Sequence, residues 1–409
     1  MDGTQPTSAE RRPDFSIVMP TYKRPDYLHR CLKHHVETLT AAGLDFEIIV
    51  CDDASGPETD AVVAEWRARD PRIRVIVQPR NVGAHANYLC GIRQARGIVT
   101  LNVSDDDLLI PEIVASYKPL FAENPRLVMV QAPWFLLNEK QNNSITGTFY
   151  TLPEPVLCAR GDHKTCLDVV ISRGIFPESY ALRTDAIDEI VTPPDEFAYM
   201  YFAMLAHAVS AGDVLFSPAP HAIVTAVSKH GDHLGARETA VAWDKFRGGL
   251  EYLVSYARGG APEADWRGVE AHVQAFTLNR MANALRLQIA KQSWFSAWQL
   301  LRRLQAYGEK PLAAETVEEL ASLAAIDAIA REAHMLGATD MVVEDRVYSI
   351  VHHAVRGSSG GMEIVPADDW SGERRGRVAF VGMALKRGPQ HRDSDLVFDL
   401  AAAMRRLAL

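Results

Sequence analysis

A chain of 409 residues is longer than one hydrophobic core usually supports, so two domains are expected. Its 47% hydrophobic and 23% charged residues are typical of a soluble globular protein, and no run approaches the roughly 20 apolar residues of a membrane-spanning helix. The formal net charge of −9 argues against a broad nucleic-acid-binding surface. Five cysteines without a CxxC pair predict reduced, buried thiols and a cytoplasmic location. The polar residues 1–14 lack the apolar core of a signal peptide and are expected to form a flexible tail.

The first part of the chain alternates predicted strands with predicted helices. Strands are expected over 15–20, 46–51, 73–78 and 98–103, with helices over 25–42, 58–69 and from 81 to about 97. This alternation predicts right-handed βαβ units around a parallel sheet, which binds ligands beyond the carboxyl ends of its strands. The polar residues that follow these strands are Thr21 and Tyr22, Asp52 and Asp53, Arg80 and Asn81, and Ser104 to Asp107. They are therefore expected to surround one crevice.

The acidic segment 104–107 follows a buried strand and reads Ser-Asp-Asp-Asp. Three adjacent carboxylates repel one another unless a cation or hydrogen-bond donors lie among them. Such oxygen ligands suit Mg²⁺ or Mn²⁺, which one or two carboxylates hold together with substrate phosphates. The alternative is a solvated acidic turn or an aspartate that caps the next helix. Neither the GxGxxG fingerprint nor the P-loop motif occurs in this half, which favours a metal-bridged phosphate.

Four segments resemble the ordered motifs of family-two glycosyltransferases: 15–24 (FSIVMPTYKR), 48–55 (IIVCDDAS), 80–83 (RNVG) and 103–109 (VSDDDLL). These are inverting GT-A enzymes that use nucleotide sugars. The resemblance is strong over 15–110 and weaker to about 235, where further strands are expected over 127–132, 179–183, 214–218 and 222–228 and a helix over 162–172. It implies a GT-A domain over 15–235, that is, an α/β, Rossmann-like fold with a mostly parallel sheet.

The resemblance also implies which residues bind the donor. The second aspartate of the Asp-Asp-x-Ser element, Asp53, would accept a hydrogen bond from the base, usually uracil, and Asp52 is the weaker candidate. The remaining candidates are Pro20, Thr21 and Tyr22 for the nucleotide pocket and Arg80 for the base or phosphate. The alternative for the aspartate pair is a helix cap, and for Arg80 a solvated surface arginine.

The acidic segment departs from the commonest family form, Asp-Ser-Asp-Asp, because Ser104 stands in place of the first aspartate. A Thr-Asp-Asp variant of the family matches 104–106 better. By that alignment Asp106 would bind the metal, Asp105 would hold ribose or a metal-bound water, and Asp107 would be an N-cap or a group supporting the ligands. All three remain metal-ligand candidates, since the alignment can shift by one residue. After the last predicted strand of the domain, His230 or His233 could complete the metal site and Lys229 could contact phosphate.

The segment 193–196 reads Pro-Pro-Asp-Glu and precedes an apolar, aromatic run to 205. Prolines and carboxylates are both favoured at the start of a helix, which is the structural alternative. The resemblance places here the catalytic base, which takes the proton of the acceptor hydroxyl as that oxygen attacks the anomeric carbon. Glu196 is favoured for this role and Asp195 is second.

The chain beyond residue 236 has a helical pattern and no chemistry-bearing cluster. Helices are expected over 241–256, 266–290, 294–307, 314–336 and 341–355, followed by a flexible linker over 356–361, one strand-like run over 378–383 and a final helix over 395–407. We expect a mainly α-helical domain over 236–409 that shapes the acceptor site or forms a homodimer. The run 299–303 lacks the tryptophan of the QxxRW pattern of processive members, so a single-transfer enzyme is expected.

The predicted function is transfer of one sugar from a nucleoside diphosphate sugar, with UDP the favoured nucleotide, to a hydroxyl of a glycan, lipid-linked, natural-product or protein acceptor. A divalent Mn²⁺ or Mg²⁺ ion would assist. Two other classes remain open. A nucleotidyltransferase acting on sugar phosphates shares this kind of sheet, but the segment 20–24 lacks the glycines of its usual basic loop. A non-catalytic module that binds nucleotide sugars or proteins is the second.

Overall fold

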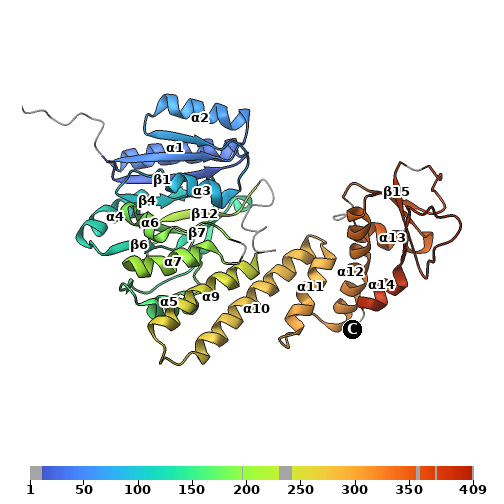
Figure 1. The fold of residues 1–409 in the computed structure, drawn as a ribbon. Coiled ribbons are helices and arrows are strands. Elements are labelled where there is room, and N and C mark those ends of the chain that lie inside the picture. The colour runs from blue at the N-terminus through green and yellow to red at the C-terminus, as the bar shows by residue number, and fades with distance from the viewer. Residues whose placement is uncertain (1–11, 196, 230–241, 356–359, 374, 408–409) are drawn as a thin grey trace, which may run out of the picture. The chain divides into compact units, whose positions relative to one another are not determined.

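The computed structural model describes residues 12–195, 197–229, 242–355, 360–373 and 375–407 (Figure 1). These residues fall into two compact units: one includes the chain up to 229 and Asp244–Phe276, and the other includes Thr277–Leu409. Residues 1–11 of the expected tail, Glu196, 230–241 with both candidate histidines, and 356–359 of the expected linker lie outside the described residues. The domain boundary expected at 235/236 falls in one of these gaps and stays a prediction. No helix in the described ranges is both long and apolar enough to cross a membrane.

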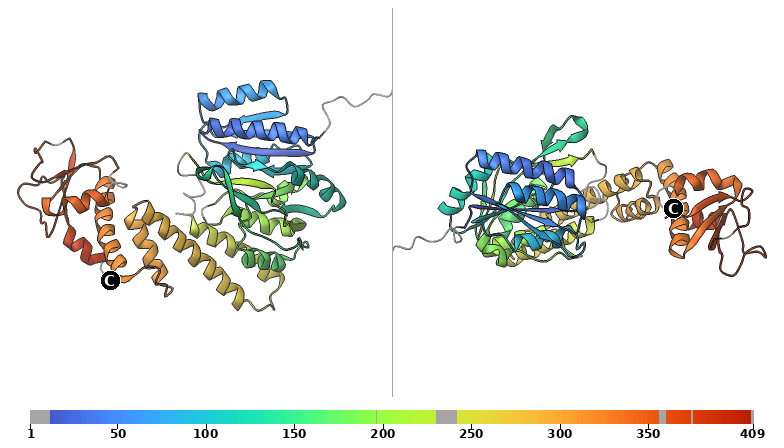
Figure 2. Two further views of the ribbon diagram at one scale, coloured as in Figure 1. Left: turned by 180° about the vertical axis from the view of Figure 1, so that it is seen from behind. Right: turned by 90° about the horizontal axis from the view of Figure 1, so that it is seen from above.

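The first unit is organised around an eight-stranded sheet with the order β3-β2-β1-β4-β10-β6-β11-β9. Figure 2 shows the ribbon from behind and from above. Its strands are β1 (Phe15–Thr21), β2 (Phe46–Asp52), β3 (Ile73–Val77), β4 (Val99–Asn102), β6 (Leu127–Gln131), β9 (Val156–Cys158), β10 (Tyr180–Arg183) and β11 (Asp213–Phe216). The first four strands pair in parallel, as the sequence predicts, and β10 lies antiparallel between β4 and β6. Every residue of β2 is buried, which explains why its sequence is mostly apolar.

The helices of this unit before residue 229 are α1 (Pro25–Ala41), α2 (Pro57–Arg69), α3 (Ala84–Ile92), α4 (Pro111–Glu123), α5 (His163–Arg173), α6 (Ile187–Ile190) and α7 (Met200–Ala211). Proline opens α1, α2 and α4, where its missing N–H costs no helical hydrogen bond. Helix α3 packs closely on the sheet, because a Cβ on Gly91 would lie 2.6 Å from a methyl group of Val18 in β1. The sequence predicts that this helix continues to about residue 97, but it ends at Ile92.

A second sheet in the same unit has the order β5-β12-β7-β8. Its strands are β5 (Leu108–Leu109), β12 (Ala222–Val227), β7 (Trp134–Asn138) and β8 (Ser144–Thr148). Strand β5 directly follows the acidic segment, so its pairing with β12 brings residues 222–227 beside that segment. Strand β8 pairs with β7 as a mostly exposed edge strand, and its polar sequence resembles that of a loop.

The helical character predicted for the C-terminal region is confirmed by α9 (Trp243–Gly260), α10 (Arg267–Ala290), α11 (Trp294–Gln305) and α12 (Ala314–Met335). Helix α9 and the part of α10 up to Phe276 belong to the first unit, whereas the second unit contains α11, α12 and a four-stranded parallel sheet in the order β14-β13-β15-β16. Its remaining elements are β13 (Ala338–Val343), α13 (Asp345–Ala354), β14 (Glu363–Pro366), β15 (Arg377–Gly382), β16 (Leu396–Asp399) and α14 (Leu400–Leu407).

In this unit only the strand-like run 378–383 is predicted as a strand, and it corresponds to β15. The predictions of single helices over 341–355 and 395–407 are wrong, because each range begins with a strand that leads into a helix. The buried strand β13 contributes an apolar run too short to be distinguished from a helical pattern.

The prediction of reduced thiols is confirmed for the whole set: all five cysteines are free, and only Cys90 is not buried.

Candidate functional site

The strand ends that carry polar residues meet at one edge of the eight-stranded sheet. Thr21, the last residue of β1, is paired with Asp52 of β2, and the N–H of Asp53 donates to the Thr21 carbonyl at 3.0 Å. On the other side of β1, the N–H of Val103 donates to the Val18 carbonyl at 3.0 Å and leads the chain into the acidic segment. The Thr21, Asp52–Asp53 and 104–107 segments thus lie along one edge of the sheet, where the sequence predicts a crevice.

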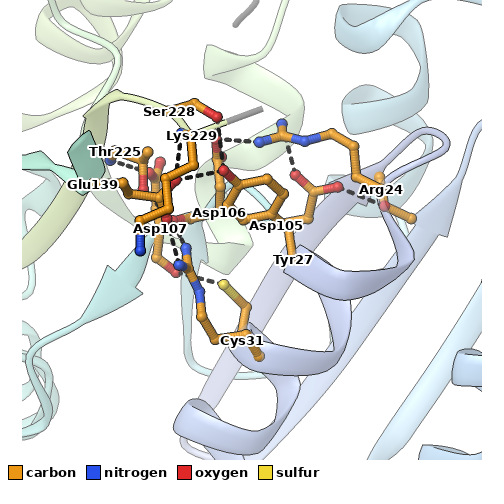
Figure 3. Close-up of polar contacts among 12 residues, drawn as sticks. Arg24, Tyr27, Cys31, Asp105, Asp106, Asp107, Glu139, Thr225, Ser228 and Lys229 are labelled. Atoms are coloured by element: carbon orange, nitrogen blue, oxygen red, sulfur yellow. Dashed lines mark hydrogen bonds and ion pairs between the residues drawn. The ribbon is translucent and has the colours of Figure 1, made fainter. Parts of the chain in front are cut away.

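The acidic segment is buried and paired with cationic and hydroxyl groups (Figure 3). Asp105 and Asp106 are only 2% and 7% exposed. The Thr21 hydroxyl donates to Asp105 Oδ2 at 2.6 Å, and Arg24 Nη1 lies 3.0 Å from Asp105 Oδ1. The other terminal nitrogen of Arg24 pairs with Asp106 Oδ2. One guanidinium therefore bridges the carboxylates of two adjacent aspartates.

Burial and neighbouring charges both change the pKa values of Asp105 and Arg24. Burial raises the pKa of the Asp105 carboxyl and the neighbouring Asp106 carboxylate raises it further, while Arg24 and the Thr21 hydroxyl oppose the change. For Arg24, burial disfavours the charged form, but the Asp105 and Asp106 carboxylates outweigh it and the pKa of the guanidinium is raised. The site therefore favours a cation beside its two carboxylates.

Asp107 faces a different partner. Its Oδ1 accepts the N–H of Thr225 in β12 at 3.0 Å, while the Thr225 hydroxyl donates to the backbone carbonyl of Asp106 at 2.7 Å. The expectation that Asp107 caps the next helix is wrong, because the N-cap of α4 is Ile110. The side chain of Asp107 instead links the acidic segment to β12 of the second sheet. This link fixes the backbone that carries Asp105 and Asp106.

The Asp52–Asp53 pair organises two neighbouring turns. Asp53 accepts the backbone N–H groups of Val82 and Gly83 at 2.7 and 3.0 Å, so it fixes the loop that enters α3. Asp52 accepts the N–H of Ser55 at 3.1 Å and also its hydroxyl proton. Neither aspartate caps α2, whose N-cap is Gly56 without a side-chain bond. The helix-cap alternative for this pair is therefore wrong for the helix that follows β2.

The other predicted donor-binding residues lie at the same edge with fewer contacts. Pro20 and Thr21 end β1, and Tyr22 follows with its side chain 41% exposed. Arg80 is exposed and makes no hydrogen bond or ion pair with any residue that the structure describes. The arrangement leaves Tyr22 and Arg80 accessible to a bound molecule.

The predicted base segment is only partly described. Asp195 is exposed and its Oδ1 accepts the N–H of Phe197 at 2.8 Å. The helix expected from 193 begins at Met200, with Tyr199 as its N-cap, so Asp195 does not lie in a first helical turn. Glu196, His230 and His233 fall outside the described residues, and the exposed Lys229 is the last residue before that gap.

Sequence reasoning missed a buried carboxylate beside the acidic segment, Glu139. It is 3% exposed and accepts the Tyr27 hydroxyl at 2.6 Å, Arg30 Nη1 at 2.5 Å and the N–H of Lys229 at 3.0 Å. Burial alone would raise its pKa, but these three donors lower the pKa of Glu139 to about 2. Glu139 thus ties the chain leaving β12 to helix α1.

The donors to these acids share one face of α1. Arg24, Tyr27 and Arg30 recur every third residue, and both guanidinium carbons lie 4.8 Å from the centre of the Tyr27 ring. Arg30 Nη2 also donates to the backbone carbonyl of Asp106 at 3.1 Å. The spacing of these residues in the sequence could have indicated a common face, although not the acids that it meets.

The antiparallel strand β10 brings a second polar group to the same edge of the sheet. Glu178 accepts the Tyr199 hydroxyl at 2.6 Å, and Ser179 Oγ lies 2.6 Å from His221 Nε2. Nδ1 of His221 is 2.8 Å from the Tyr117 hydroxyl, and burial lowers the pKa of this imidazole to about 4. The histidine is therefore neutral at physiological pH and fully hydrogen-bonded.

The carboxylates of Asp105 and Asp106 could supply part of the ligand shell of a hard divalent cation. No cluster of three or more histidine, cysteine or acidic side chains with metal-holding geometry occurs within the described ranges. Asp105 and Asp106 nevertheless present two buried carboxylates to one cation, and Mg²⁺-type sites need only one or two, with phosphates and water completing the shell. The carboxylates fit such an ion once Arg24 has left the space between them.

Comparison with known proteins gives a family match for part of the first unit. Residues 16–171 match the family model described as "Glycosyl transferase family 2". The chain is 33% identical over 106 residues to a chondroitin synthase of Escherichia coli, covering 26% of this chain and 15% of that protein. It is 32% identical over 113 residues to an N-acetylglucosaminyltransferase of Sinorhizobium fredii, covering 27% of each. The chain thus spans about a quarter or less of the length of these relatives.

Solved structures give a weaker likeness. The S. aureus TarS fragment 1–349 in complex with UDP-GlcNAc has a TM-score of 0.43 at 16% identity, covering 71% of this chain and 87% of that one. A mannosyltransferase from Pyrobaculum calidifontis in complex with GDP-Man and Mn²⁺ has a TM-score of 0.44 at 15% identity, covering 75% and 85%. Scores at this level support no argument about the site.

Proposed function

We propose that this chain is a GT-A enzyme that transfers one sugar from a nucleoside diphosphate sugar to an acceptor hydroxyl with inversion, because residues 16–171 match the model of glycosyl transferase family 2. The observation that carries this proposal is the pair of buried carboxylates, Asp105 and Asp106, held at the carboxyl edge of the parallel sheet beside the Asp53 turn. A uridine diphosphate sugar is the favoured donor. The acceptor is a glycan, lipid-linked, natural-product or protein hydroxyl.

For the donor, we assign the base and ribose to the turns after β1 and β2. Asp53 is already fixed by two backbone N–H groups, so its remaining lone pairs have a set direction for a base N–H. Tyr22 is exposed at the end of β1 for stacking, and the Arg80 guanidinium, which has no partner among the described residues, is assigned to the base or a phosphate. Asp105, oriented by the Thr21 hydroxyl, is assigned to ribose or to a metal-bound water.

Asp106 is the residue we assign to the metal ion, with Asp105 next to it and His230 or His233 as a third ligand. When bound, Mn²⁺ or Mg²⁺ would neutralise charge on the departing diphosphate. The contacts from Thr225 and Arg30 to the Asp106 backbone carbonyl support this role, because they fix the main chain that carries the carboxylate.

In the transfer step, the acceptor oxygen forms a bond to the anomeric carbon as the bond from that carbon to the diphosphate oxygen breaks. The acceptor proton passes to a carboxylate, which we assign to Glu196, with Asp195 second. Glu178 and Ser179 directly precede β10, which begins at the same edge of the sheet, and we assign them to the acceptor side. The second unit is proposed to shape the acceptor site or to form a homodimer.

Calorimetric titration of UDP, GDP and dTDP, each with and without Mn²⁺, tests the donor proposal. We expect metal-dependent binding of UDP to the wild type and its loss in Asp106→Ala. Asp60→Ala is the matched control, since it removes one exposed aspartate of the same unit. If no diphosphate binds the wild type, the proposal fails and a protein-binding module is favoured.

The base assignment needs a separate test. Glu196→Gln should bind the donor normally but should lower the turnover number by 100-fold or more, since general-base catalysis contributes about 10²–10⁴-fold. Asp195→Asn should have a smaller effect, of less than about 10-fold on this estimate. The reverse order of the two variants would move the base to Asp195, and two normal turnover numbers would place it elsewhere.

A further inference from the structure

Arg24, the N-cap residue of α1, supplies a cation to the carboxylates that we assign to the metal. Arg24 Nη1 lies 3.0 Å from Asp105 Oδ1, and its other terminal nitrogen pairs with Asp106 Oδ2. The guanidinium thus lies between the two acids, in the region that a cation bound by both would use. A guanidinium and a divalent ion repel each other, so they cannot share these carboxylates at close range.

The structure around Arg24 holds it in this position. Lys23 adopts a positive φ of 53°, and its N–H donates to Ser55 Oγ at 2.8 Å. Ser55 is in turn bonded to Asp52, so the turn that aims Arg24 is fixed to the end of β2. The guanidinium carbon also lies 4.8 Å from the centre of the Tyr27 ring, which adds a cation–π contact. These contacts preorganise the arginine toward the acids.

A diphosphate offers Arg24 another partner. The planar guanidinium matches phosphate oxygens as well as carboxylate oxygens, and the Arg24 side chain is still 31% exposed. A phosphate at this edge of the sheet would draw the arginine away from Asp105 and Asp106 and release both carboxylates for the metal. Metal and diphosphate would then each favour the binding of the other, as linkage between two sites requires.

We propose that Arg24 is a gate for the metal site: it competes with the divalent ion for Asp105 and Asp106, and the donor diphosphate relieves that competition. The identity of the diphosphate rests on the proposed function, whereas the competition between Arg24 and the metal does not. Arg24 is a positioning residue in this scheme, because its effect on transfer acts through the metal ligands.

The test is calorimetric titration of MnCl₂ at pH 8, without and with saturating UDP. In the wild type we expect UDP to tighten Mn²⁺ binding by about 10-fold or more, within the 5–150-fold range typical of coupled sites. Arg24→Ala should bind Mn²⁺ alone about 10-fold more tightly than the wild type, and UDP should tighten it less. Arg24→Lys keeps a positive charge and should lie between the two.

Matched variants separate the gate from a general effect of charge or folding. Arg69→Ala removes an exposed arginine that pairs with Glu65 on α2, and it should bind Mn²⁺ as the wild type does. Arg24→Gln keeps a polar side chain and provides a second neutral variant if Arg24→Ala does not fold. The proposal is overturned if a folded neutral variant binds Mn²⁺ no more tightly than the wild type. Failure of UDP to bind the wild type would instead refute the proposed function, and the titrations with metal alone would still decide the role of Arg24.

Discussion

Replacing Glu139 with glutamine should destabilise the first unit strongly at neutral pH. This carboxylate is 3% exposed and accepts three hydrogen bonds, one from the Arg30 guanidinium. The pKa of Glu139 is lowered from 4.5 to about 2, a difference of roughly 2.5 units that corresponds to about 3 kcal/mol in favour of the ionised form. Glutamine has the same shape but carries no charge, so most of this contribution should be lost.

The sign of the pH dependence follows from the lowered pKa. The stabilisation is fully present above the unfolded-state pKa near 4.5 and is lost as the pH falls through 4.5 toward 2. The free energies of unfolding of the wild type and of Glu139→Gln should therefore differ by about 3 kcal/mol at pH 7 and by about 1 kcal/mol at pH 3. At pH 7 this corresponds to a loss of roughly 6–12 °C in the Tm of the first unit.

Differential scanning calorimetry and urea unfolding at both pH values provide the measurement. Glu123→Gln is the matched control, because Glu123 is exposed at the end of α4, and it should change stability by less than about 0.5 kcal/mol. A loss below about 1 kcal/mol at pH 7, or a loss of the same size at pH 3, would refute this reasoning. Either result would mean that Arg30 and Tyr27 are no better paired with the charged carboxylate than with a neutral amide.

The strands around the candidate site could be predicted because their sequences carry a strong local signal. β2 is buried along its whole length, so apart from Glu47 it reads as an apolar run that stops at Asp52 and Asp53. The acidic segment likewise follows a mostly buried strand, β4. Once the strands are parallel, the geometry of the sheet brings these ends together without any further information.

The residues that hold the acidic segment could not be predicted in the same way. Glu139 and Tyr27 are 112 positions apart, and no local pattern links them. Glu139 follows β7 in a stretch of polar residues, where a glutamate normally indicates a solvated loop. Thr225 belongs to a strand that the sequence predicts, but its pairing with the carbonyl of Asp106 depends on β12 crossing to a second sheet.

The C-terminal sheet was missed for a different reason. In both mispredicted helices, a strand of four to six residues runs directly into a helix. β13 leads through Glu344 into α13, and β16 leads without any intervening residue into α14. Without a glycine or proline between them, the two elements merge into one apolar pattern, and a buried strand cannot be told from a helical turn by periodicity alone.

Two further substitutions test the packing and the nucleotide side of the site. Asp53→Asn should weaken UDP binding by about 10–100-fold, because an amide cannot accept both N–H groups of the loop before α3 as the carboxylate does. Mn²⁺ binding in the absence of UDP should be unchanged. If calorimetry gives equal UDP affinities for the variant and the wild type, Asp53 does not belong to the base site. Gly97→Ala should lower the free energy of unfolding by about 3 kcal/mol. The added Cβ would lie 2.6 Å from the Phe15 carbonyl carbon and against the N–H of Ser16. Both are backbone atoms of a buried strand, so they cannot move aside. Gly268→Ala is the matched control, because its Cβ in α10 would meet nothing within 4 Å, and it should be neutral or stabilising by up to about 1 kcal/mol. Equal stability of the two alanine variants in urea unfolding would show that β1 can shift away from residue 97, and the close contact could then not be what holds this edge of the sheet.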